Sequence, residues 1–342
     1  MKVANLYGPL DIRTEDWPLP VPVREQVLVK IRASGICGSD INSYTGRTYE
    51  GTFPYVPGHE WSGEVEQVGD AVATLRKGDK VTGETVVGCG NCDKCKAGVN
   101  PNFCRSPTVY GFQTRAPGGF AQYVLRDERN LSKLPPAMTH DQGALVEPLS
   151  VAYHAVWGLA GGVQSTETVV VFGAGPVGLF ALSVVKGSRA RAIAIDPIEM
   201  RRDLALRLGA DHVVDPLRED VTQQVLRLTG GHGADLVLEA SGNDDARSRL
   251  FDVADGSGRV VMIGQTQMKR IPMEMEKLVV KGLTVRGAQG SPGMFQRTID
   301  FLEHSPADLT LMISHHFPLE KTKEALDLAS QRTGSVKVVL TD

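Results

Sequence analysis

The chain lacks any marked imbalance of charge. Of its 342 residues, 37 are Lys or Arg and 40 are Asp or Glu, so the net charge near neutral pH is −3. A chain with this balance has no bulk electrostatic attraction for nucleic acid or for an acidic membrane surface. We therefore expect no nucleic-acid partner and no membrane partner.

Long uninterrupted apolar segments are also missing. The longest apolar stretch, residues 169–185, approaches the length of a membrane span, but three glycines and a proline interrupt it between positions 173 and 178. The N-terminus reaches polar and helix-breaking residues too early for the apolar core of a signal peptide. These two absences lead us to expect a cytoplasmic protein.

Cysteines are few, and their number is odd. Four of the five crowd between positions 89 and 104, with the spacing C-x2-C-x2-C followed by a fourth cysteine. This spacing is typical of a closed tetrahedral zinc site and not of a secreted disulfide framework. The alternatives are two disulfides, a redox C-x-x-C pair and an iron–sulfur site. The predicted ligands of a structural zinc ion are Cys89, Cys92, Cys95 and Cys104.

The length of the chain suggests about two domains, and its 42% of apolar residues is ample for packed cores. The first 150 residues are rich in Gly and Pro and contain short β-like segments at 27–33, 61–68 and 119–124, which is typical of an all-β unit. From about residue 151 to 288, apolar strands alternate with amphipathic helices such as 221–228. This alternation predicts a parallel, doubly wound sheet with strands at 168–172, 190–195, 212–214, 236–239, 259–263 and 283–285.

A glycine-rich motif, Gly-Ala-Gly-Pro-Val-Gly, occupies positions 173–178 between an apolar strand and an apolar helix. The glycines allow a tight turn and a close approach of the backbone to a pyrophosphate, which the N–H groups of the helix N-terminus then bind. Asp196 ends the next strand, where an acid binds the ribose hydroxyls of NAD and repels the additional phosphate of NADP. Arg201 and Arg202 follow closely and leave NADP as the less favoured alternative. A βαβ turn that binds no phosphate is the structural alternative. The predicted cofactor-binding residues are Gly173, Gly175, Pro176, Val177, Gly178, Asp196 and Arg201.

Three further segments contain residues that could bind a metal: Cys37, the pair His59-Glu60, and Glu147. Each also has a purely structural explanation. Cys37 could be an inert buried thiol, His59 a core histidine, and Glu147 an acid at the start of a helix. Spacing alone does not bring these segments together, so both interpretations stay open at this point.

The order of the motifs along the chain resembles that of the zinc-dependent alcohol dehydrogenases of the medium-chain dehydrogenase/reductase superfamily. Cys-Gly-Ser-Asp stands at 37–40 and Gly-His-Glu at 58–60, and the four-cysteine cluster, a Glu-Pro pair and the glycine motif follow. The segment Glu-Pro-Leu-Ser at 147–150 is most similar to the polyol (sorbitol) and threonine dehydrogenase branch. Simple alcohol dehydrogenases of the family usually carry a cysteine at that point.

The resemblance implies an α/β fold with two domains. Residues 1–150 and 289–342 would form a GroES-like β-rich catalytic domain, and residues 151–288 a Rossmann doubly wound parallel-sheet domain that binds NAD. It also implies a homodimer or homotetramer. Two Zn²⁺ ions per chain are implied, one structural and one catalytic.

Carried over residue by residue, the resemblance implies the ligands of the catalytic zinc. Cys37 and His59 would bind it directly. Glu60 matches the acid after the histidine, which joins the metal in polyol-type relatives. Glu147 matches the remaining ligand position, either bound directly or through water.

Two neighbouring residues take implied roles in support of this site. Asp40 resembles the carboxylate that orients the histidine ligand, and Ser39 the hydroxyl that begins a proton relay. Asn42 is a departure, because it stands where a histidine often ends that relay.

The implied activity is zinc-dependent hydride transfer between NAD and a secondary alcohol, which becomes a ketone. The substrate would be a small molecule such as a polyol, a sugar alcohol or an (amino)cyclitol. A threonine-type hydroxy amino acid dehydrogenase and a zinc-free NADPH quinone or enone reductase are the alternatives among enzymes. A zinc-containing nucleotide-binding regulator without catalysis is the alternative from another class.

Overall fold

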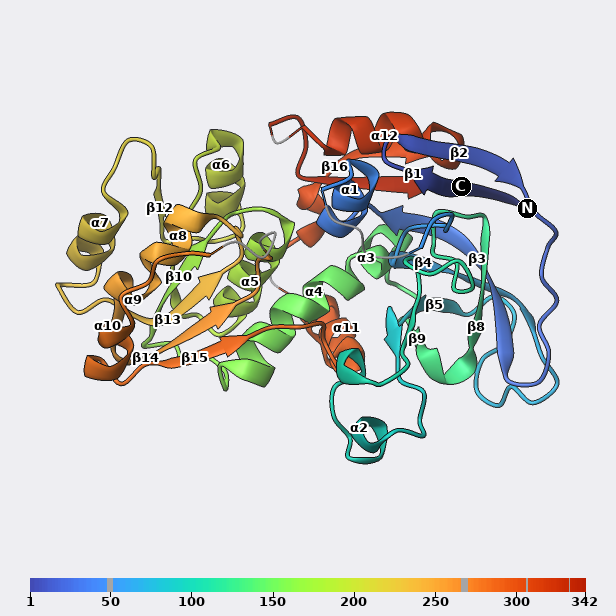
Figure 1. Cartoon of the computed structure of the whole chain (residues 1–342), viewed down its shortest axis with the longest axis horizontal. Coiled ribbons are helices and arrows are strands. Elements are labelled where there is room, and N and C mark those ends of the chain that lie inside the picture. Colours follow the sequence, from blue (N-terminus) through green and yellow to red (C-terminus); the bar gives the residue numbers. More distant parts are fainter. Residues whose placement is uncertain (48–51, 266–269, 306, 332) are drawn as a thin grey trace. The chain divides into compact units, whose positions relative to one another are not determined.

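The computed structural model describes residues 1–47, 52–265, 270–305, 307–331 and 333–342. Contacts between these residues divide the chain into two compact units, which Figure 1 shows coloured along the sequence. The first unit holds Met1–Glu147, Phe295–His304 and Ile313–Asp342, and the second holds Pro148–Met294 and Ser305–Met312. The chain therefore leaves the first unit after Glu147, returns to it at Phe295, and returns again at Ile313.

The first unit is built on a seven-stranded sheet in the order β16-β17-β3-β4-β5-β9, with β8 also pairing β3. The pair β16–β17 is parallel, and the other described pairs of this sheet are antiparallel. Val27, Val29 and Ile31 of β3 are buried in one cluster with Trp61 and Val81 of the neighbouring strands. Residues two apart on a strand share a face, so this alternation places one face of the sheet in a core.

The strands and helices of this unit come from the N-terminal and the C-terminal parts of the chain, and the C-terminal strand β17 pairs with β3. Its strands are β1 (Lys2–Gly8), β2 (Asp11–Asp16), β3 (Gln26–Gly35), β4 (Glu60–Val68), β5 (Lys80–Gly83), β6 (Val86–Val87), β7 (Thr108–Val109), β8 (Tyr123–Asp127), β9 (Leu131–Lys133), β16 (Ile313–Pro318) and β17 (Lys337–Thr341). Its helices are α1 (Gly38–Tyr44), α2 (Asp93–Lys96), α3 (His140–Ala144), α11 (Phe295–His304) and α12 (Thr322–Ala329).

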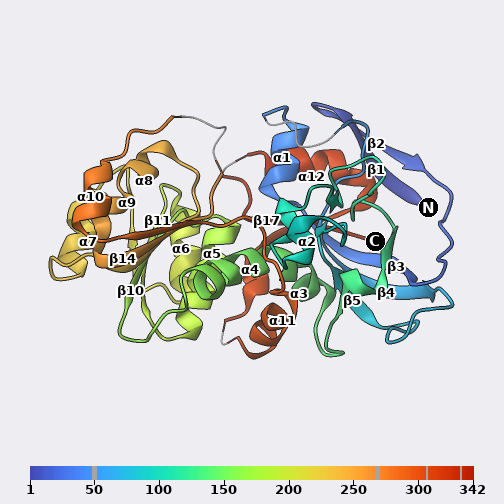
Figure 2. The same cartoon turned by 60° about the horizontal axis from the view of Figure 1, so that its bottom comes forward.

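The second unit contains a six-stranded parallel sheet in the order β12-β11-β10-β13-β14-β15. The strand order reverses beside β10, which is the topology of doubly wound dinucleotide-binding sheets. Figure 2 shows α5 on one face of this sheet and α8 and α9 on the other. Because helices cover both faces, the central strands are apolar along nearly their whole length.

The elements of the second unit alternate between strand and helix along the chain. Its strands are β10 (Thr168–Phe172), β11 (Arg191–Ile195), β12 (His212–Val214), β13 (Ala234–Glu239), β14 (Ala254–Met262) and β15 (Thr284–Gly287). Its helices are α5 (Pro176–Gly187), α6 (Glu199–Arg207), α7 (Val221–Leu228), α8 (Asp244–Ser248), α9 (Leu250–Val253) and α10 (Met275–Val280). Helix α4 (Val146–Tyr153) begins in the first unit and continues into a π-helical turn, His154–Leu159.

The apolar stretch 169–185 is divided between β10 and α5. Among the described residues, no helix is both long enough and apolar enough to cross a membrane.

The strand expected at 119–124 is displaced in the structure, where β8 begins at Tyr123. The backbone N–H groups of residues 118–120 instead donate to carbonyl oxygens of residues 56–58, at distances between 2.6 and 2.9 Å. Glycines at 118 and 119 allow this close approach of two loops. The loop that leads into His59 is therefore held by a distant segment of the chain.

Candidate metal and cofactor sites

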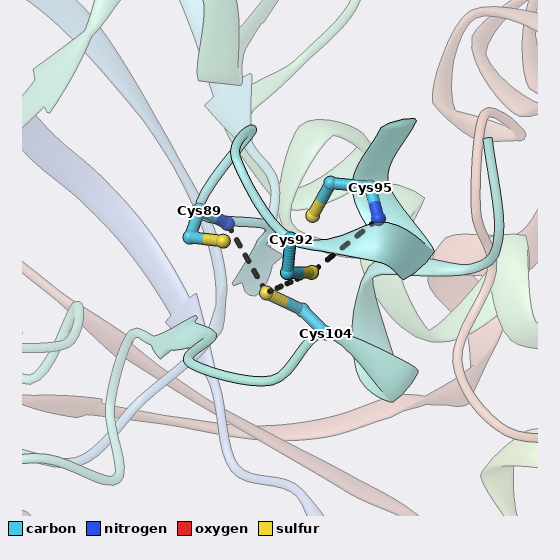
Figure 3. A group of neighbouring side chains, drawn as sticks. All are labelled: Cys89, Cys92, Cys95 and Cys104. Carbon is cyan, nitrogen blue, oxygen red and sulfur yellow. Dashed lines mark hydrogen bonds between the residues drawn. The ribbon is translucent and has the colours of Figure 1, made fainter. Parts of the chain in front are cut away.

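Four cysteine side chains converge in the loop between β6 and β7 (Figure 3). The sulfur atoms of Cys89, Cys92, Cys95 and Cys104 all lie within 4.8 Å of one another, and those of Cys92 and Cys104 are 3.8 Å apart. Thiolates on a tetrahedral zinc ion, with Zn–S bonds of about 2.3 Å, are separated by about 3.8 Å. The cluster therefore fits a zinc ion, and its cysteines are unpaired, which argues against the disulfide alternative.

Backbone N–H groups point at the sulfur atoms of Cys92 and Cys104 and favour the thiolate form of these two residues. The N–H of Cys95 donates to Cys92 Sγ at 3.4 Å, and the N–H of Cys89 donates to Cys104 Sγ at 3.2 Å. Hydrogen bonds from the backbone N–H groups of Arg105 and Cys95 lower the pKa of Cys92 to about 6. Because a thiolate is the form that binds metals, the loop is prepared for a cation.

A second group of possible metal ligands lies where β3 ends and β4 begins. The ligand atoms of Cys37, His59 and Glu60 lie within 4.8 Å of one another. Cys37 is the N-cap of α1, and its N–H donates to the carboxylate of Asp40 at 2.9 Å. Sulfur, imidazole and carboxylate donors at this separation form a donor set that fits zinc.

Asp40 also faces the histidine of this group. Its Oδ1 lies 3.7 Å from His59 Nδ1, a buried nitrogen that has no hydrogen-bond partner among the described residues. Burial lowers the pKa of His59, but the charges of Asp40 and Cys37 outweigh it and hold that pKa well above its usual value. Burial raises the pKa of Asp40. Asp40 therefore lies on the Nδ1 side of the His59 ring.

Glu60 has a partner that the sequence motifs do not reveal. Its carboxylate contacts the ammonium of Lys337 on β17, and both side chains are only 2% exposed. Lys337 Nζ also donates to the carbonyl oxygen of Ile36 at 3.0 Å. The signal available in the sequence is a single charged residue inside the apolar run 336–340.

Glu147 lies in the first turn of α4, beside this group but outside the set of three ligand atoms that lie within 4.8 Å. Its Oε1 accepts a hydrogen bond from Thr85 Oγ1 at 3.1 Å. Burial raises the pKa of Glu147 to about 7. Burial and the charge of Glu147 together raise the pKa of Glu84 to about 7. No sequence motif marks Thr85 or Glu84, because their relation to Glu147 arises only when the chain folds.

Two further side chains complete the surroundings of this group. The ring of Phe112 packs against the ring of His59, with centroids 5.0 Å apart, and provides an apolar wall. The hydroxyl of Ser39, in the first turn of α1, is buried and has no hydrogen-bond partner among the described residues. An unpartnered buried hydroxyl is free to bind a proton donor or acceptor from a ligand.

Residues 173–178 form the turn from β10 into α5, in which Gly175 is the N-cap and Pro176 the first helical residue. Gly173 has a φ of 87°, a left-handed conformation that glycine adopts without strain. A Cβ atom on Gly178 would lie 1.8 Å from the carbonyl oxygen of Gly173, so the helix packs on the turn only with glycine here. The predicted cofactor-binding segment, Val177 included, thus has the geometry of a dinucleotide-binding turn.

Asp196 directly follows β11, and its carboxylate is tied to the glycine turn. Oδ2 accepts the N–H of Ala174 and Oδ1 the N–H of Ile198, each at 2.8 Å. Arg201 Nη1 lies 3.9 Å from Oδ2, and Arg202 donates to the carbonyl oxygen of Asp196. The structure therefore brings the predicted residues Gly173, Gly175, Asp196 and Arg201 to one edge of the parallel sheet.

Comparison with known families matches both halves of the chain. The model of the alcohol dehydrogenase GroES-like domain matches residues 23–136, and that of the zinc-binding dehydrogenases matches residues 176–304. The predicted family and the predicted combination of a GroES-like and a Rossmann fold are confirmed.

Individual relatives cover nearly the whole chain. L-threonine 3-dehydrogenase of Bacillus licheniformis is 37% identical, with 94% of this chain and 93% of that protein covered. Sorbitol dehydrogenase of Bacillus subtilis is 31% identical, with 97% and 94% covered. A provisionally assigned zinc-binding dehydrogenase from Sinorhizobium meliloti, solved with NADP, has a TM-score of 0.93 and 28% identity, with 100% and 99% covered. The chain belongs to the zinc-dependent medium-chain dehydrogenase family and is an oxidoreductase that acts on a hydroxyl compound.

Proposed function

We propose that the chain is an NAD-dependent zinc dehydrogenase that oxidises a secondary alcohol of a polyol, sugar alcohol or (amino)cyclitol to a ketone. The observation that carries this proposal is the group Cys37, His59 and Glu60, with a carboxylate, Glu147, beside it. A carboxylate is a harder ligand than a thiolate, and it accepts hydrogen bonds from hydroxyl groups. Such a site favours a substrate that carries several hydroxyls over a simple alcohol.

Two zinc ions per chain are part of the proposal. The four-cysteine cluster would hold a structural ion, since it offers four thiolates and no open position. Cys37 and His59, with Glu60 or Glu147, would hold the catalytic ion. When bound there, zinc supplies Lewis-acid polarisation of the substrate oxygen.

Side chains of the first unit orient the metal ligand, exclude water and transfer the proton. Asp40 holds the ring of His59 in orientation from the Nδ1 side. The ring of Phe112 excludes water from the same side chain. The buried hydroxyl of Ser39 relays the proton: its oxygen accepts the proton that the substrate hydroxyl loses while its own proton passes to water. Because Asn42 cannot take up a proton as a histidine would, the proton leaves through water.

The domain roles follow from the same assignment. Residues 1–150 and 289–342 would form the catalytic domain, and residues 151–288 the NAD-binding domain. The carboxylate of Asp196 supports NAD over NADP, because it would repel a 2′-phosphate. Arg202, which could neutralise that phosphate, is already paired with Asp215 at 3.1 Å. NADP stays the alternative because Arg201 is near.

The proposal also includes a cytoplasmic homodimer or homotetramer. Five unpaired cysteines support a reducing compartment. β15 is the edge strand of the six-stranded sheet, and Val279 and Val280, just before it, are 70% and 76% exposed. Exposed valines beside a strand that has no further neighbour among the described residues support association with a second copy.

A threonine-type hydroxy amino acid is the second candidate substrate, favoured by the identity to the Bacillus licheniformis enzyme. The acidic surroundings of Glu147 disfavour it, since Glu84 and Glu147 lie close enough to interact and would together repel the carboxylate of such a substrate.

The experiment that tests the proposal follows reduced nicotinamide by its absorbance while purified protein is mixed with NAD or NADP and a panel of alcohols. The panel holds linear polyols, inositols and aminocyclitols, threonine, and simple secondary alcohols. We expect turnover with NAD confined to polyols or cyclitols, and two zinc ions per chain by metal analysis. Turnover of threonine alone would support the second candidate. Turnover of simple alcohols alone, or fewer than two zinc ions, would contradict the site assignment.

A further inference from the structure

We propose that the buried ion pair of Glu239 and Arg247 is a clamp that positions the dinucleotide-binding edge of the second unit. The pair holds the turn 240–242 against the glycine motif and so sets the affinity for the cofactor without touching it. This inference rests on the proposed binding of a nicotinamide dinucleotide by that unit. Both residues would be positioning residues.

Glu239 stands at the point where the strand order of the sheet reverses. It is the last residue of β13, its side chain is fully buried, and it lies in register with Phe172, the last residue of β10. Gly173 follows Phe172 directly. In doubly wound sheets the ligand binds outside the carboxyl ends of the strands at this reversal. The carboxylate is therefore next to the predicted cofactor turn.

One oxygen of this carboxylate shapes the following turn. Oε1 accepts the N–H of Ser241 at 2.7 Å, the hydroxyl of Ser241 at 2.7 Å and the N–H of Gly242 at 2.8 Å. Three donors on one oxygen leave the turn little freedom. Hydrogen bonds to a charged group are the stronger kind, so this arrangement is more rigid than an ordinary turn.

The other oxygen connects the turn to α8 and β14. Oε2 accepts Arg247 Nε at 3.1 Å, and the Arg247 side chain is only 11% exposed. Arg247 Nη2 donates in turn to the carbonyl oxygen of Gly264, beyond the end of β14. The backbone carbonyl of Glu239 accepts the N–H groups of Ile263 and Gly264 at 2.7 and 2.8 Å. Hydrogen bonds thus join the carboxyl end of β13 to the residues that follow β14.

The turn 240–242 is in direct contact with the glycine motif. A Cβ atom on Gly173 would lie 2.8 Å from Ser241 Cα, so the two backbones are in close contact. The N–H of Ala240 also donates to the carbonyl oxygen of Phe172 at 2.9 Å. A displacement of the 240–242 turn would therefore move the peptide groups that bind the pyrophosphate. Misplacement by a fraction of an ångström is enough to weaken such binding.

A matched control exists at the amino-terminal ends of the strands of the same sheet. Arg259 pairs with Glu167 at 2.5 Å and donates to two carbonyl oxygens, those of Ala160 and Gly162. Glu167 immediately precedes β10, so this pair ties the amino-terminal ends of the strands. It has the same chemistry as the clamp, but Glu167 lies at the opposite end of β10 from the proposed cofactor turn.

The test compares Arg247→Met, Arg247→Lys and Glu239→Gln with the control Arg259→Met in the full chain. The Kd of NADH is measured by its fluorescence on binding, without substrate, and the unfolding midpoint by denaturant. We expect Arg247→Met and Glu239→Gln to raise the Kd about tenfold or more. Arg247→Lys keeps the charge and should recover part of the loss. Arg259→Met should lower the midpoint while the Kd changes less than about twofold.

Equal changes of Kd in Arg247→Met and Arg259→Met, or no change in either, would overturn the clamp. Should Arg247→Met fail to fold, Arg247→Lys and Glu239→Gln decide in the same way. Absence of NADH binding by the unsubstituted protein would instead overturn the proposed cofactor, which keeps the two failures distinct.

Discussion

The carboxylate of Glu60 and the ammonium of Lys337 form a buried ion pair between the first residue of β4 and the first residue of β17. The two residues are 277 positions apart in the sequence. Lys337 also donates to the carbonyl oxygen of Ile36, the residue before Cys37. One buried cation therefore supports both sides of the proposed catalytic metal site from the C-terminal strand.

Replacing Lys337 by Met should destabilise the first unit. In the zinc-free protein the substitution leaves Glu60 buried without a cation, and removing one partner of a buried pair costs about 3–5 kcal/mol. The double variant Glu60→Gln with Lys337→Met should recover most of that loss, because no unpaired charge is left. Denaturant unfolding measures both. The exposed pair Lys77–Glu66, with side chains 71% and 40% exposed, is the control. We expect Lys77→Met to change the free energy of unfolding by less than about 1 kcal/mol.

Removing single cysteines should separate the two zinc sites. We expect Cys104→Ser to bind one zinc ion per chain and to lower the unfolding midpoint, because a closed four-thiolate site stabilises its loop directly. Cys37→Ser should also bind one ion but leave the midpoint nearly unchanged, while abolishing turnover. Metal analysis and calorimetry measure these effects. Two ions retained by Cys104→Ser would contradict the structural site.

Replacing Glu147 by Cys should shift the substrate preference towards simple secondary alcohols. The thiolate is a softer ligand and a weaker acceptor of hydrogen bonds from additional hydroxyls. We expect the ratio of kcat/KM for a simple alcohol to that for a polyol to rise about tenfold. The matched variant Thr85→Val keeps the carboxylate and removes only the hydrogen bond from Thr85 Oγ1, so it should shift the ratio far less. An unchanged ratio in Glu147→Cys would rule out this account of specificity.

Glu128 should make the stability of the first unit depend on acid pH. Its carboxylate accepts the N–H groups of Ala73, Thr74 and Leu75 and the hydroxyl of Thr74. These hydrogen bonds, led by that of Ala73, lower its pKa to about 2. Because the pKa of an unfolded chain's Glu is about 4.3, the stabilisation is complete above that value and is lost as the pH falls towards 2.

The corresponding measurement is denaturant unfolding of Glu128→Gln between pH 7 and pH 3. The variant should be less stable than the unsubstituted chain at pH 7, and the difference should shrink at pH 3. The control is Glu25→Gln, at a side chain that is 57% exposed, and its effect on the free energy of unfolding should depend little on pH. A constant difference across this range would show that the charge of Glu128 is not the cause.

The local motifs could be predicted because contiguous residues form them. The C-x2-C-x2-C spacing closes within a single loop, and the glycine motif is one strand-to-helix turn. The parallel sheet could also be predicted, because the hydrophobic periodicity of each strand and each helix is visible in its own segment of the sequence. The prediction of a strand at 119–124 was wrong for its first residues. The N–H groups of residues 119 and 120 donate to carbonyl oxygens of the loop 56–58 instead of to a neighbouring strand.

The family and the two-part α/β fold could be predicted from the amino-acid sequence alone. The sequence also supplied the candidate residues for binding zinc and a dinucleotide. Three contacts arise only in the folded chain: Lys337 with Glu60, Thr85 with Glu147, and Ser241 with Gly173. The two partners of each contact lie far apart along the chain, so no local pattern of residues links them. A backbone turn is set by its own residues, whereas a buried ion pair depends on which strands become neighbours and in which register.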